Sequence, residues 1–314
     1  MTQITLEQID PPDRVIVAHM TLAERVAMAV ELLRANVPPE GYYVADSYGK
    51  DSCAIVKLCE LSGVKHDCWY NNTTIDAPEL IHFGKKNHPH TKWNNPPISM
   101  MKMMAEDCSS PPTRWSRWCC EVYKEGGGGT DRTRVMGVRA AESPARKRNW
   151  SEVVGINRRQ YPMAIAPIVY WTNNQLWEFI IEYNIPVCEL YAEGWKRLGC
   201  IGCPLAGCEH QAREFERWPA YERNWRRAIV ANWEKWHAVP LQKPRKVKIG
   251  YDDAGKPIYT ENTIRYQGYF KSGEQMYEWW RTMKSPREVD GGCISELLWT
   301  NAPDLDESAE GVVT

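Results

Sequence analysis

The sequence has neither a strong charge excess nor a long apolar run, and each absence excludes a class of protein. Its 39 Lys and Arg residues nearly balance 40 Asp and Glu residues, so the formal net charge of −1 predicts no general affinity for polyanions. No stretch approaches the roughly 18 consecutive apolar residues that a membrane span requires. The opening MTQITLEQIDPPDR is polar and acidic and lacks the apolar core of a signal peptide. We therefore expect a cytoplasmic protein without a membrane partner.

Internal repeats and a Walker A loop are also absent, because the spacing GxxxxGK[ST] does not occur. Cysteine, by contrast, is abundant, with 11 residues. Without a secretion signal, these cysteines favour free thiols, metal ligation or redox chemistry over a disulfide framework. Four of them lie in apolar or helical surroundings and are expected to be small structural residues: Cys53, Cys59, Cys68 and Cys188.

Strand and helix patterns alternate in the first part of the chain. Residues 21–35 have apolar side chains at helical spacing, which predicts a helix. Strands are expected at 41–47 and 66–74, each followed by a helix, at 51–63 and 75–86. This alternation predicts an α/β fold with a doubly wound parallel sheet, whose ligands bind at the carboxyl ends of the strands.

The later part of the chain is expected to be rich in helices and loops. Residues 110–129 end in four glycines and predict a mobile loop. A helix is expected within 171–186, with Thr172 as its N-cap. Residues 213–239 read as helical with Trp and Arg interleaved, and residues 246–260 predict a hairpin around the sequence DDAG.

The stretch SYGKDS lies at the expected junction between a strand and a helix. Such a junction offers free backbone N–H groups and the positive end of the helix dipole to an anion, above all a phosphate. Gly49 lets the backbone approach a ligand, Lys50 adds positive charge, and the hydroxyls of Ser47 and Ser52 can donate hydrogen bonds. Asp51 can orient the ligand. An ordinary turn with Ser as the helix N-cap explains the same residues equally well.

A dense basic run, RAAESPARKR, follows the strand expected before Gly137. Arg139 and Arg146 could clamp a phosphate or sulfate through bidentate hydrogen bonds. A run of solvated surface charge is the alternative, but the position directly after a strand favours a binding site.

Two cysteine pairs have the spacing of metal ligands. Cys119 and Cys120 are adjacent, while Cys200 and Cys203 form a CxxC bounded by glycines. Four thiolates suit zinc or an iron–sulfur cluster, and because adjacent cysteines seldom bind one zinc with good geometry, a 4Fe-4S cluster is favoured. Two unrelated pairs of buried thiols remain the alternative. Cys208 or His210 could replace one ligand, as both follow closely in the sequence.

Three segments resemble the phosphoadenosine phosphosulfate (PAPS) reductase family, within the PP-loop adenine nucleotide α-hydrolase-like superfamily. They are SYGKDS, GVRAAESPARKRN, and the block from API to GCIGCP, and together they cover about residues 40–210. The resemblance implies a Rossmann-like nucleotide-binding domain over residues 1–210. We expect a Trp- and Arg-rich helical and hairpin extension over 211–302 and a disordered acidic tail at 303–314.

The resemblance also implies roles for individual residues. It implies nucleotide phosphate binding by Ser47, Gly49, Lys50, Asp51 and Ser52, and phosphate or sulfate contact by Arg139 and Arg146. Catalytic roles are implied for Lys50, Asp51 and Arg139. The cysteine pairs look like the 4Fe-4S ligands of assimilatory sulfonucleotide reductases: Cys119, Cys120, Cys200 and Cys203.

Two departures from the family pattern bear on function. Tyr48 replaces the first glycine of the usual SGGKDS loop and is expected to narrow the phosphate cradle. The reductases that the chain resembles also carry a catalytic cysteine in a C-terminal Glu-Cys-Gly motif, which is absent here. Cys293, in GGCISELL, is the only cysteine after residue 208.

Because GKDS resembles the loop of members that cleave ATP to AMP and pyrophosphate, the first hypothesis is an ATP pyrophosphatase. This enzyme would use ATP and Mg²⁺ to adenylate an oxygen atom of a nucleic acid, and a sulfur atom would then replace that oxygen. A cysteine desulfurase is a candidate donor of the sulfur. The second hypothesis is a sulfonucleotide reductase that uses Cys293 and a thiol reductant to release sulfite. The third is a nucleotide-binding subunit without catalytic activity.

Residues 211–248 contain ten Lys and Arg residues against four Asp and Glu residues, an excess of positive charge that favours a nucleic acid partner. A structural helix with buried Trp faces explains the pattern as well.

Overall fold

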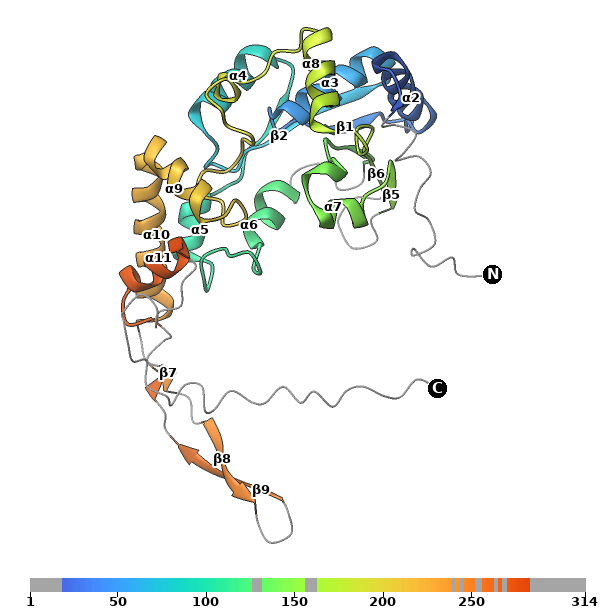
Figure 1. Cartoon of the computed structure of the whole chain (residues 1–314). Helices are drawn as coiled ribbons and strands as arrows, with labels where there is room; N and C mark the ends of the chain where they lie inside the picture. The colour runs from blue at the N-terminus through green and yellow to red at the C-terminus, as the bar shows by residue number, and fades with distance from the viewer. Residues whose placement is uncertain are drawn as a thin grey trace. The chain divides into compact units, whose positions relative to one another are not determined.

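The computed structural model forms two compact units along the chain (Figure 1). It describes residues 19–125, 132–155, 163–238, 241–242, 245–251, 256–262, 265–266 and 270–282. The first unit consists of Met1–Met100 and Ser116–Ile201, and the second of Met101–Trp115 and Gly202–Thr314. The division therefore falls between Ile201 and Gly202, nine residues before the predicted end of the nucleotide-binding domain at 210. It also assigns the segment Met101–Trp115 to the second unit.

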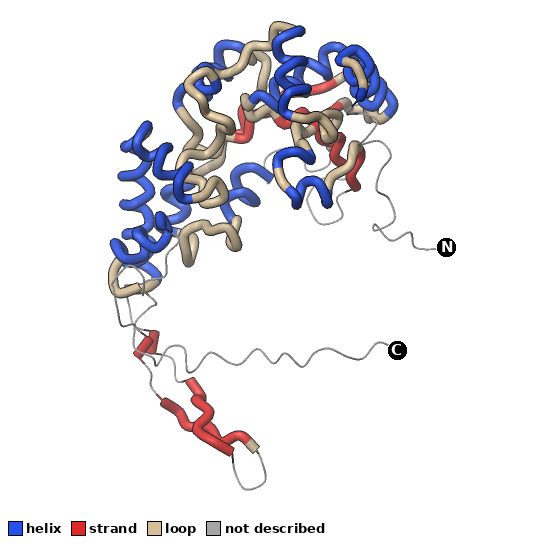
Figure 2. The backbone as a smooth tube through the Cα atoms, in the orientation of Figure 1, coloured by secondary structure: helices blue, strands red, loops and turns tan. Residues whose placement is uncertain are grey.

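A six-stranded sheet forms the centre of the first unit, with strand order β3-β2-β1-β4-β6-β5 (Figure 2). The strands are β1 (Tyr42–Ala45), β2 (His66–Asn71), β3 (Lys92–Asn94), β4 (Arg134–Val135), β5 (Val153–Gly155) and β6 (Met163–Ile165). All neighbouring pairs are parallel except β5 with β6. The predicted α/β fold with a mostly parallel sheet is confirmed, with one antiparallel strand at its edge.

Helices α2 (Leu22–Ala35), α3 (Lys50–Ser62) and α8 (Asn173–Glu182) pack together against this sheet. Their apolar faces meet the buried side chains of β1, β4 and β6 in one core, in which Leu33, Leu58 and Phe179 are fully buried. Among its described residues this unit also contains the helices α4 (Pro78–Asn87), α6 (Trp118–Cys120) and α7 (Pro144–Asn149), and short helical turns at Glu121–Glu125, Ala140–Glu142 and Glu189–Tyr191.

Local sequence signals explain where these helices begin and end. Thr21 caps α2 and Thr172 caps α8, each in a reciprocal capping box, as predicted for Thr172. Gly63 ends α3 in the left-handed conformation at φ 67°, which glycine adopts without a steric penalty. The segment 118–125, predicted to be part of a loop, is instead helical.

In the second unit, α9 (Cys208–Arg217), α10 (Pro219–Trp236) and α11 (Gly273–Thr282) pack against one another. The unit also contains most of α5 (Met100–Glu106) and the strands β7 (Leu241–Gln242), β8 (Arg245–Tyr251), β9 (Pro257–Asn262) and β10 (Arg265–Tyr266). Strands β8 and β9 pair antiparallel, which confirms the predicted hairpin, although its turn lies outside the described residues.

Tryptophans form the interior of the second unit. Trp225 of α10 stacks on Trp280 of α11 with ring centroids 4.5 Å apart, and the Trp280 indole donates to the carbonyl of Pro112. Trp218 and Trp225 are 8% and 1% exposed. These two rings are structural, as the alternative interpretation of the Trp- and Arg-rich segment expected, and they offer no stacking surface to a nucleic acid.

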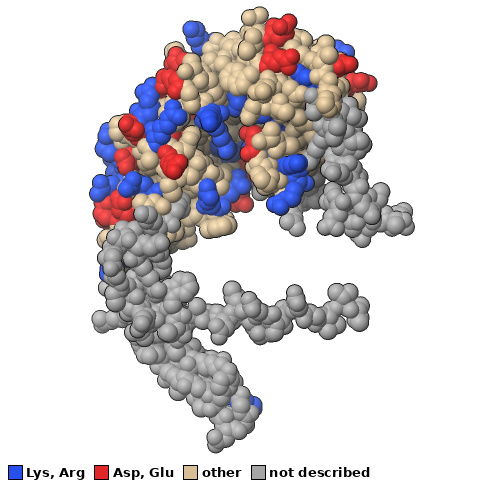
Figure 3. Space-filling view, viewed as in Figure 1, with Lys and Arg blue, Asp and Glu red and all other residues tan. Residues whose placement is uncertain are grey.

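Two further features of the structure concern membrane-spanning helices and the charge of the surface. Across the part of the chain that the structure describes, no helix is both long and apolar enough to cross a membrane. On the face shown in Figure 3, both Lys and Arg side chains and Asp and Glu side chains are present. The predicted acidic tail at 303–314 and Cys293 lie outside the described residues.

Candidate functional site

The SYGKDS loop connects β1, a central strand of the sheet, to the first turn of α3. Gly49 is the N-cap of α3, and no side chain caps the helix. Ser47 is therefore not the N-cap that the alternative interpretation required. The Ser52 hydroxyl donates to the carbonyl of Gly49 at 2.9 Å and lies 3.4 Å from the Ser47 hydroxyl. The loop places backbone N–H groups at the carboxyl edge of the sheet, where ligands of this fold class bind.

A tyrosine hydroxyl occupies the N-terminus of α3 in this structure. Tyr191 follows α8 in the chain, and its Oη accepts the backbone N–H of Lys50 at 3.0 Å. The Lys50 ammonium donates to the carbonyl of Lys196 at 3.2 Å and lies 5.4 Å from the centre of the Tyr191 ring. Burial raises the pKa of Tyr191, so the group at the helix end is a neutral hydroxyl. A phosphate that binds the Lys50 amide must displace this hydroxyl.

Arg139 joins the basic run to the loop. Its Nε donates to Asp51 Oδ1, its Nη1 to the carbonyl of Trp171 at 3.4 Å, and its Nη2 to Asn173 at 2.9 Å. The side chain is only 1% exposed, and Asp51 also pairs with the Lys50 ammonium at 3.2 Å. Since a guanidinium has five N–H groups, these three contacts leave one N–H on each Nη without a partner among the described residues.

A close approach of two backbones makes the Arg139–Asp51 pair possible. A Cβ at Gly137 would lie 2.9 Å from the backbone of Asp51, closer than side-chain atoms pack. The glycine therefore lets the chain after β4 approach the first turn of α3. Sequence reasoning placed Arg139 and Asp51 in the site separately, and the structure brings them into direct contact.

Arg146, in α7, forms an ion pair with Glu142 rather than with the loop. Burial and the positive charge of Arg197 lower the pKa of Arg146, and Asp51 opposes this effect. These electrostatic influences place Arg146, Arg197 and Asp51 in one charged neighbourhood. An anion bound there would relieve the repulsion between the arginines.

Tyr48 does not narrow the phosphate cradle, contrary to the prediction. It adopts the left-handed conformation at φ 61° that glycine adopts more easily, and its N–H donates to Asp46 at 3.1 Å. Its ring is fully buried and stacks on Tyr70 at 4.5 Å, directly against the backbone of Gly84. The burial of this ring offsets the backbone strain and fastens the loop to β2 and α4.

The four cysteines proposed as cluster ligands are divided between the two units. Cys119, Cys120 and Cys200 belong to the first unit and Cys203 to the second. A hydrogen bond from Cys119, together with the positive charges of Lys124 and Arg117, lowers the pKa of Cys120 to about 5. Cys120 is therefore a thiolate near neutral pH, the form that binds metals.

The remaining observations on the cysteines concern metal coordination and the individual contacts of each residue. Within the described ranges, no group of three or more His, Cys, Asp or Glu side chains is arranged to hold a metal ion, so the 4Fe-4S cluster stays a prediction. The backbone of Cys200 forms a bridge with Asp76. The alternative ligands have partners within the second unit, since Cys208 donates to the carbonyl of Thr282 and His210 pairs with Glu214 at 3.2 Å.

The sequence analysis missed two residues that contact the SYGKDS loop or Arg139. Tyr191 lies in the CELYAEG stretch and Asn173 in WTNNQ, both within segments that carried the family resemblance. Their contacts with Lys50 and Arg139 join residues more than 30 positions apart, which spacing alone does not reveal.

Comparison with known proteins supports the nucleotide-binding interpretation of the first unit. The family model "Phosphoadenosine phosphosulfate reductase domain" matches residues 41–206. An adenosine 5'-phosphosulfate reductase of Oceanobacillus iheyensis is 23% identical over 190 residues, which cover 57% of this chain and 78% of the relative. An adenosine 5'-phosphosulfate reductase 2 of Bacillus subtilis is 26% identical over 89 residues, which cover 28% of this chain and 37% of the relative.

Several matched relatives thus align over only about a third of their length. Among solved structures, a PAPS reductase from Candida auris in a phosphate complex is 15% identical, covers 64% of this chain and 96% of its own, and has a TM-score of 0.44.

Proposed function

Because the chain belongs to the phosphoadenosine phosphosulfate reductase domain family, we propose that it is an enzyme that binds an adenine nucleotide at the N-terminus of α3. Its proposed substrate is adenylyl sulfate or the 3'-phosphorylated form, and its proposed product is sulfite. The observation that carries this proposal is the buried Arg139, which pairs with Asp51 beside the loop and has one further N–H on each Nη beyond its contacts among the described residues. The matched adenosine 5'-phosphosulfate reductases support the choice of substrate.

In the proposed binding mode, the phosphate displaces the Tyr191 hydroxyl from the Lys50 amide. The amide and the Lys50 ammonium then compensate the phosphate charge, and Arg139 orients the sulfate group through its planar fork. Because these donors are fixed before the ligand arrives, they stabilise the charge that develops on the departing AMP.

The proposed reaction has two steps. A cysteine thiolate attacks the sulfur of adenylyl sulfate, the bond between that sulfur and the phosphate oxygen breaks, and AMP leaves with the electron pair. A thiol reductant then attacks the cysteine sulfur, so that sulfite leaves and a disulfide forms. Cys293, outside the described residues, is the nucleophile proposed from the sequence.

A nucleotide panel under anaerobic conditions tests the proposal. With a thiol reductant, the protein should release sulfite from adenylyl sulfate or its 3'-phosphorylated form, and Cys293→Ser should abolish this release. Lys50→Ala should weaken nucleotide binding, whereas the matched charge change Lys86→Ala, at an exposed position on α4, should not. Pyrophosphate release from ATP without any sulfite release would refute the reductase proposal.

A second candidate function is ATP cleavage coupled to sulfur transfer. The intact Gly49–Ser52 sequence at the start of α3 favours it, as does the missing Glu-Cys-Gly motif. In that case ATP with Mg²⁺ is the nucleotide, Lys50 stabilises the departing pyrophosphate, and a nucleic acid or other acceptor receives sulfur from a donor such as a cysteine desulfurase. Under this hypothesis Cys293→Ser retains ATP pyrophosphatase activity.

For either reaction we propose a 4Fe-4S cluster on Cys119, Cys120, Cys200 and Cys203. The thiolate state of Cys120 and the CxxC spacing fit iron coordination. When bound, such a cluster would supply redox capacity. Iron and sulfide analysis of anaerobically reconstituted protein tests it, and one zinc with no iron would refute it.

A further inference from the structure

A second cluster of chemically competent side chains lies in the first unit directly beside the phosphate loop, since Asp46 precedes that loop in the chain and Cys53 follows it. Cys53 Sγ is 3.6 Å from His88 Nε2, and His88 Nδ1 is 2.7 Å from Asp46 Oδ2. The Thr91 hydroxyl donates to the same Asp46 oxygen at 2.9 Å. A nucleophile, a base and a group that orients the base are thus connected in series by hydrogen bonds.

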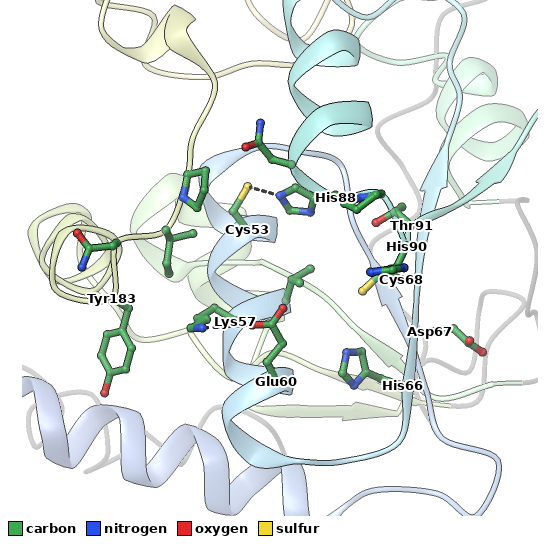
Figure 4. Close-up of a pocket in the computed structure, with 16 residues that line it drawn as sticks. Cys53, Lys57, Glu60, His66, Asp67, Cys68, His88, His90, Thr91 and Tyr183 are labelled. Atoms are coloured by element: carbon green, nitrogen blue, oxygen red, sulfur yellow. Dashed lines mark hydrogen bonds and ion pairs between the residues drawn. The ribbon is translucent and has the colours of Figure 1, made fainter.

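This series faces a cavity. Cys53 and His88 line a pocket of about 400 Å³ together with residues from α3, the start of β2 and the loop after α8 (Figure 4). Cys53 is only 1% exposed, and it belongs to the lining of this cavity. In Figure 4 the Cys53 thiol and the His88 ring point toward each other from the first turns of α3 and the end of α4.

The charged groups of the cavity wall are largely compensated. Glu60 pairs with Lys57 at 3.3 Å. Asp67 is bound by two cations, Lys92 at 2.8 Å and Arg132 at 2.9 Å. The remaining polar side chains carry imidazoles, amides and hydroxyls, contributed by His66, His88, His90, Asn87, Asn184, Thr91 and Tyr183. Such a lining suits a small polar molecule.

We propose that Cys53 is a nucleophilic thiol that forms a mixed disulfide with a small polar disulfide in this cavity. The Cys53 sulfur attacks one sulfur of the disulfide while its proton passes to His88 Nε2. The bond between the two sulfurs of the small disulfide breaks. The departing sulfur leaves as a thiolate, and this thiolate takes the proton from His88. The small disulfide is the oxidant, and Asp46 holds the ring of His88 and stabilises its charged form.

The resting state of the thiol fits this role. Burial, together with the negative charges of Asp46 and Asp51, raises the pKa of Cys53, so the thiol is neutral until a base accepts its proton. Its weak hydrogen bond to the carbonyl of Tyr48, at 3.7 Å, leaves His88 as the base within reach. Reactivity at Cys53 therefore depends on His88.

The same helix provides an internal control. Cys59, six residues later on α3, is also buried, and burial also raises its pKa. For Cys59, the described part of the chain places no imidazole against the sulfur. Unfolding would expose both cysteines alike, so the ratio of their reaction rates separates reactivity in the folded state from global opening.

The test exposes the full, reduced chain to oxidised glutathione and measures mixed-disulfide formation at each cysteine by peptide mass mapping. Cys53 should react at least about ten-fold faster than Cys59, a modest share of what a general base contributes. His88→Gln should lower the Cys53 rate to that of Cys59. Thr91→Val removes only the hydrogen bond from the Thr91 hydroxyl to Asp46, so it should lower the Cys53 rate only partly.

Equal rates at Cys53 and Cys59 in the wild-type protein would refute the proposal, as would an unchanged Cys53 rate in His88→Gln. If His88→Gln proves too unstable to compare, Thr91→Val decides, because it leaves both Cys53 and His88 in place. An unchanged ratio in that variant would then show that Cys53 does not depend on the series.

Discussion

Replacement of Asp51 by Ala should destabilise the first unit more than replacement of its neighbour Lys50. The sequence alone predicts that both substitutions weaken nucleotide binding and leave the fold intact, because an exposed ligand loop contributes little to a core. The structure corrects the premise: Lys50 is 7% exposed, and Asp51 is the carboxylate partner of a 1% exposed Arg139. Asp51→Ala leaves that guanidinium buried without an opposing charge.

The expected magnitudes follow from what each variant leaves unpaired. Loss of one partner of a buried ion pair costs about 3–5 kcal/mol, and the retained bonds from Arg139 to Trp171 and Asn173 favour the lower end, about 3 kcal/mol. Lys50→Ala leaves Asp51 paired with Arg139 and should cost about 1 kcal/mol. Asp51→Asn keeps an oxygen that accepts from Arg139 and should cost about 1–2 kcal/mol.

The assay is amide hydrogen exchange of peptides from β1 and α3, which reports the opening free energy of the first unit alone. A double-mutant cycle with Arg139→Met isolates the pair, since the double variant Asp51→Ala/Arg139→Met no longer buries an unpaired cation. We expect a coupling energy of about 2 kcal/mol. A coupling below about 0.5 kcal/mol, or a smaller loss for Asp51→Ala than for Lys50→Ala, would refute this reasoning.

Three further predictions concern other parts of the molecule. Gly84→Ala should lower the free energy of unfolding by about 1–3 kcal/mol in a urea titration, because the added Cβ would lie 2.3 Å from the ring of Tyr48; an unchanged midpoint would mean that the ring can move. Anaerobically reconstituted Cys119→Ala should lose iron while Cys208→Ala retains it, and the reverse result would replace one proposed ligand by the other. Asp67 pairs with Lys92 and Arg132, and these contacts lower the pKa of its carboxyl group. The stability that Asp67 contributes is therefore present above the pKa that this group has in the unfolded chain, and it is lost as the pH falls below about 4. Asp67→Asn should therefore flatten the acid limb of the stability profile, by well under about 1 kcal/mol since the carboxylate is partly exposed, and an unchanged acid limb would contradict this assignment.

Much of the first unit could be predicted from short segments of sequence. The strands and helices around SYGKDS, the N-cap at Thr172 and the end of α3 at Gly63 all depend on neighbours within a few residues. The parallel arrangement follows from the alternation of strand and helix, because a strand that returns through a helix joins its neighbour in parallel. The short helix at 118–125 was missed because its glycine-rich continuation dominated the local signal.

The contacts that make the loop a site depend on the tertiary structure. The sequence identified Lys50, Asp51 and Arg139 as binding residues by type and position, but only folding brings Arg139 across 88 residues to Asp51 and excludes water from the pair. Tyr48 illustrates the same point, since its place in the loop predicted an obstruction, whereas packing against Tyr70 turns the ring into the interior. Local propensity and periodicity therefore determined the elements and the residue types at the loop. Burial and long-range contact, which depend on where the whole chain places each side chain, decided which of those residues are paired, which are strained and which remain available to a ligand.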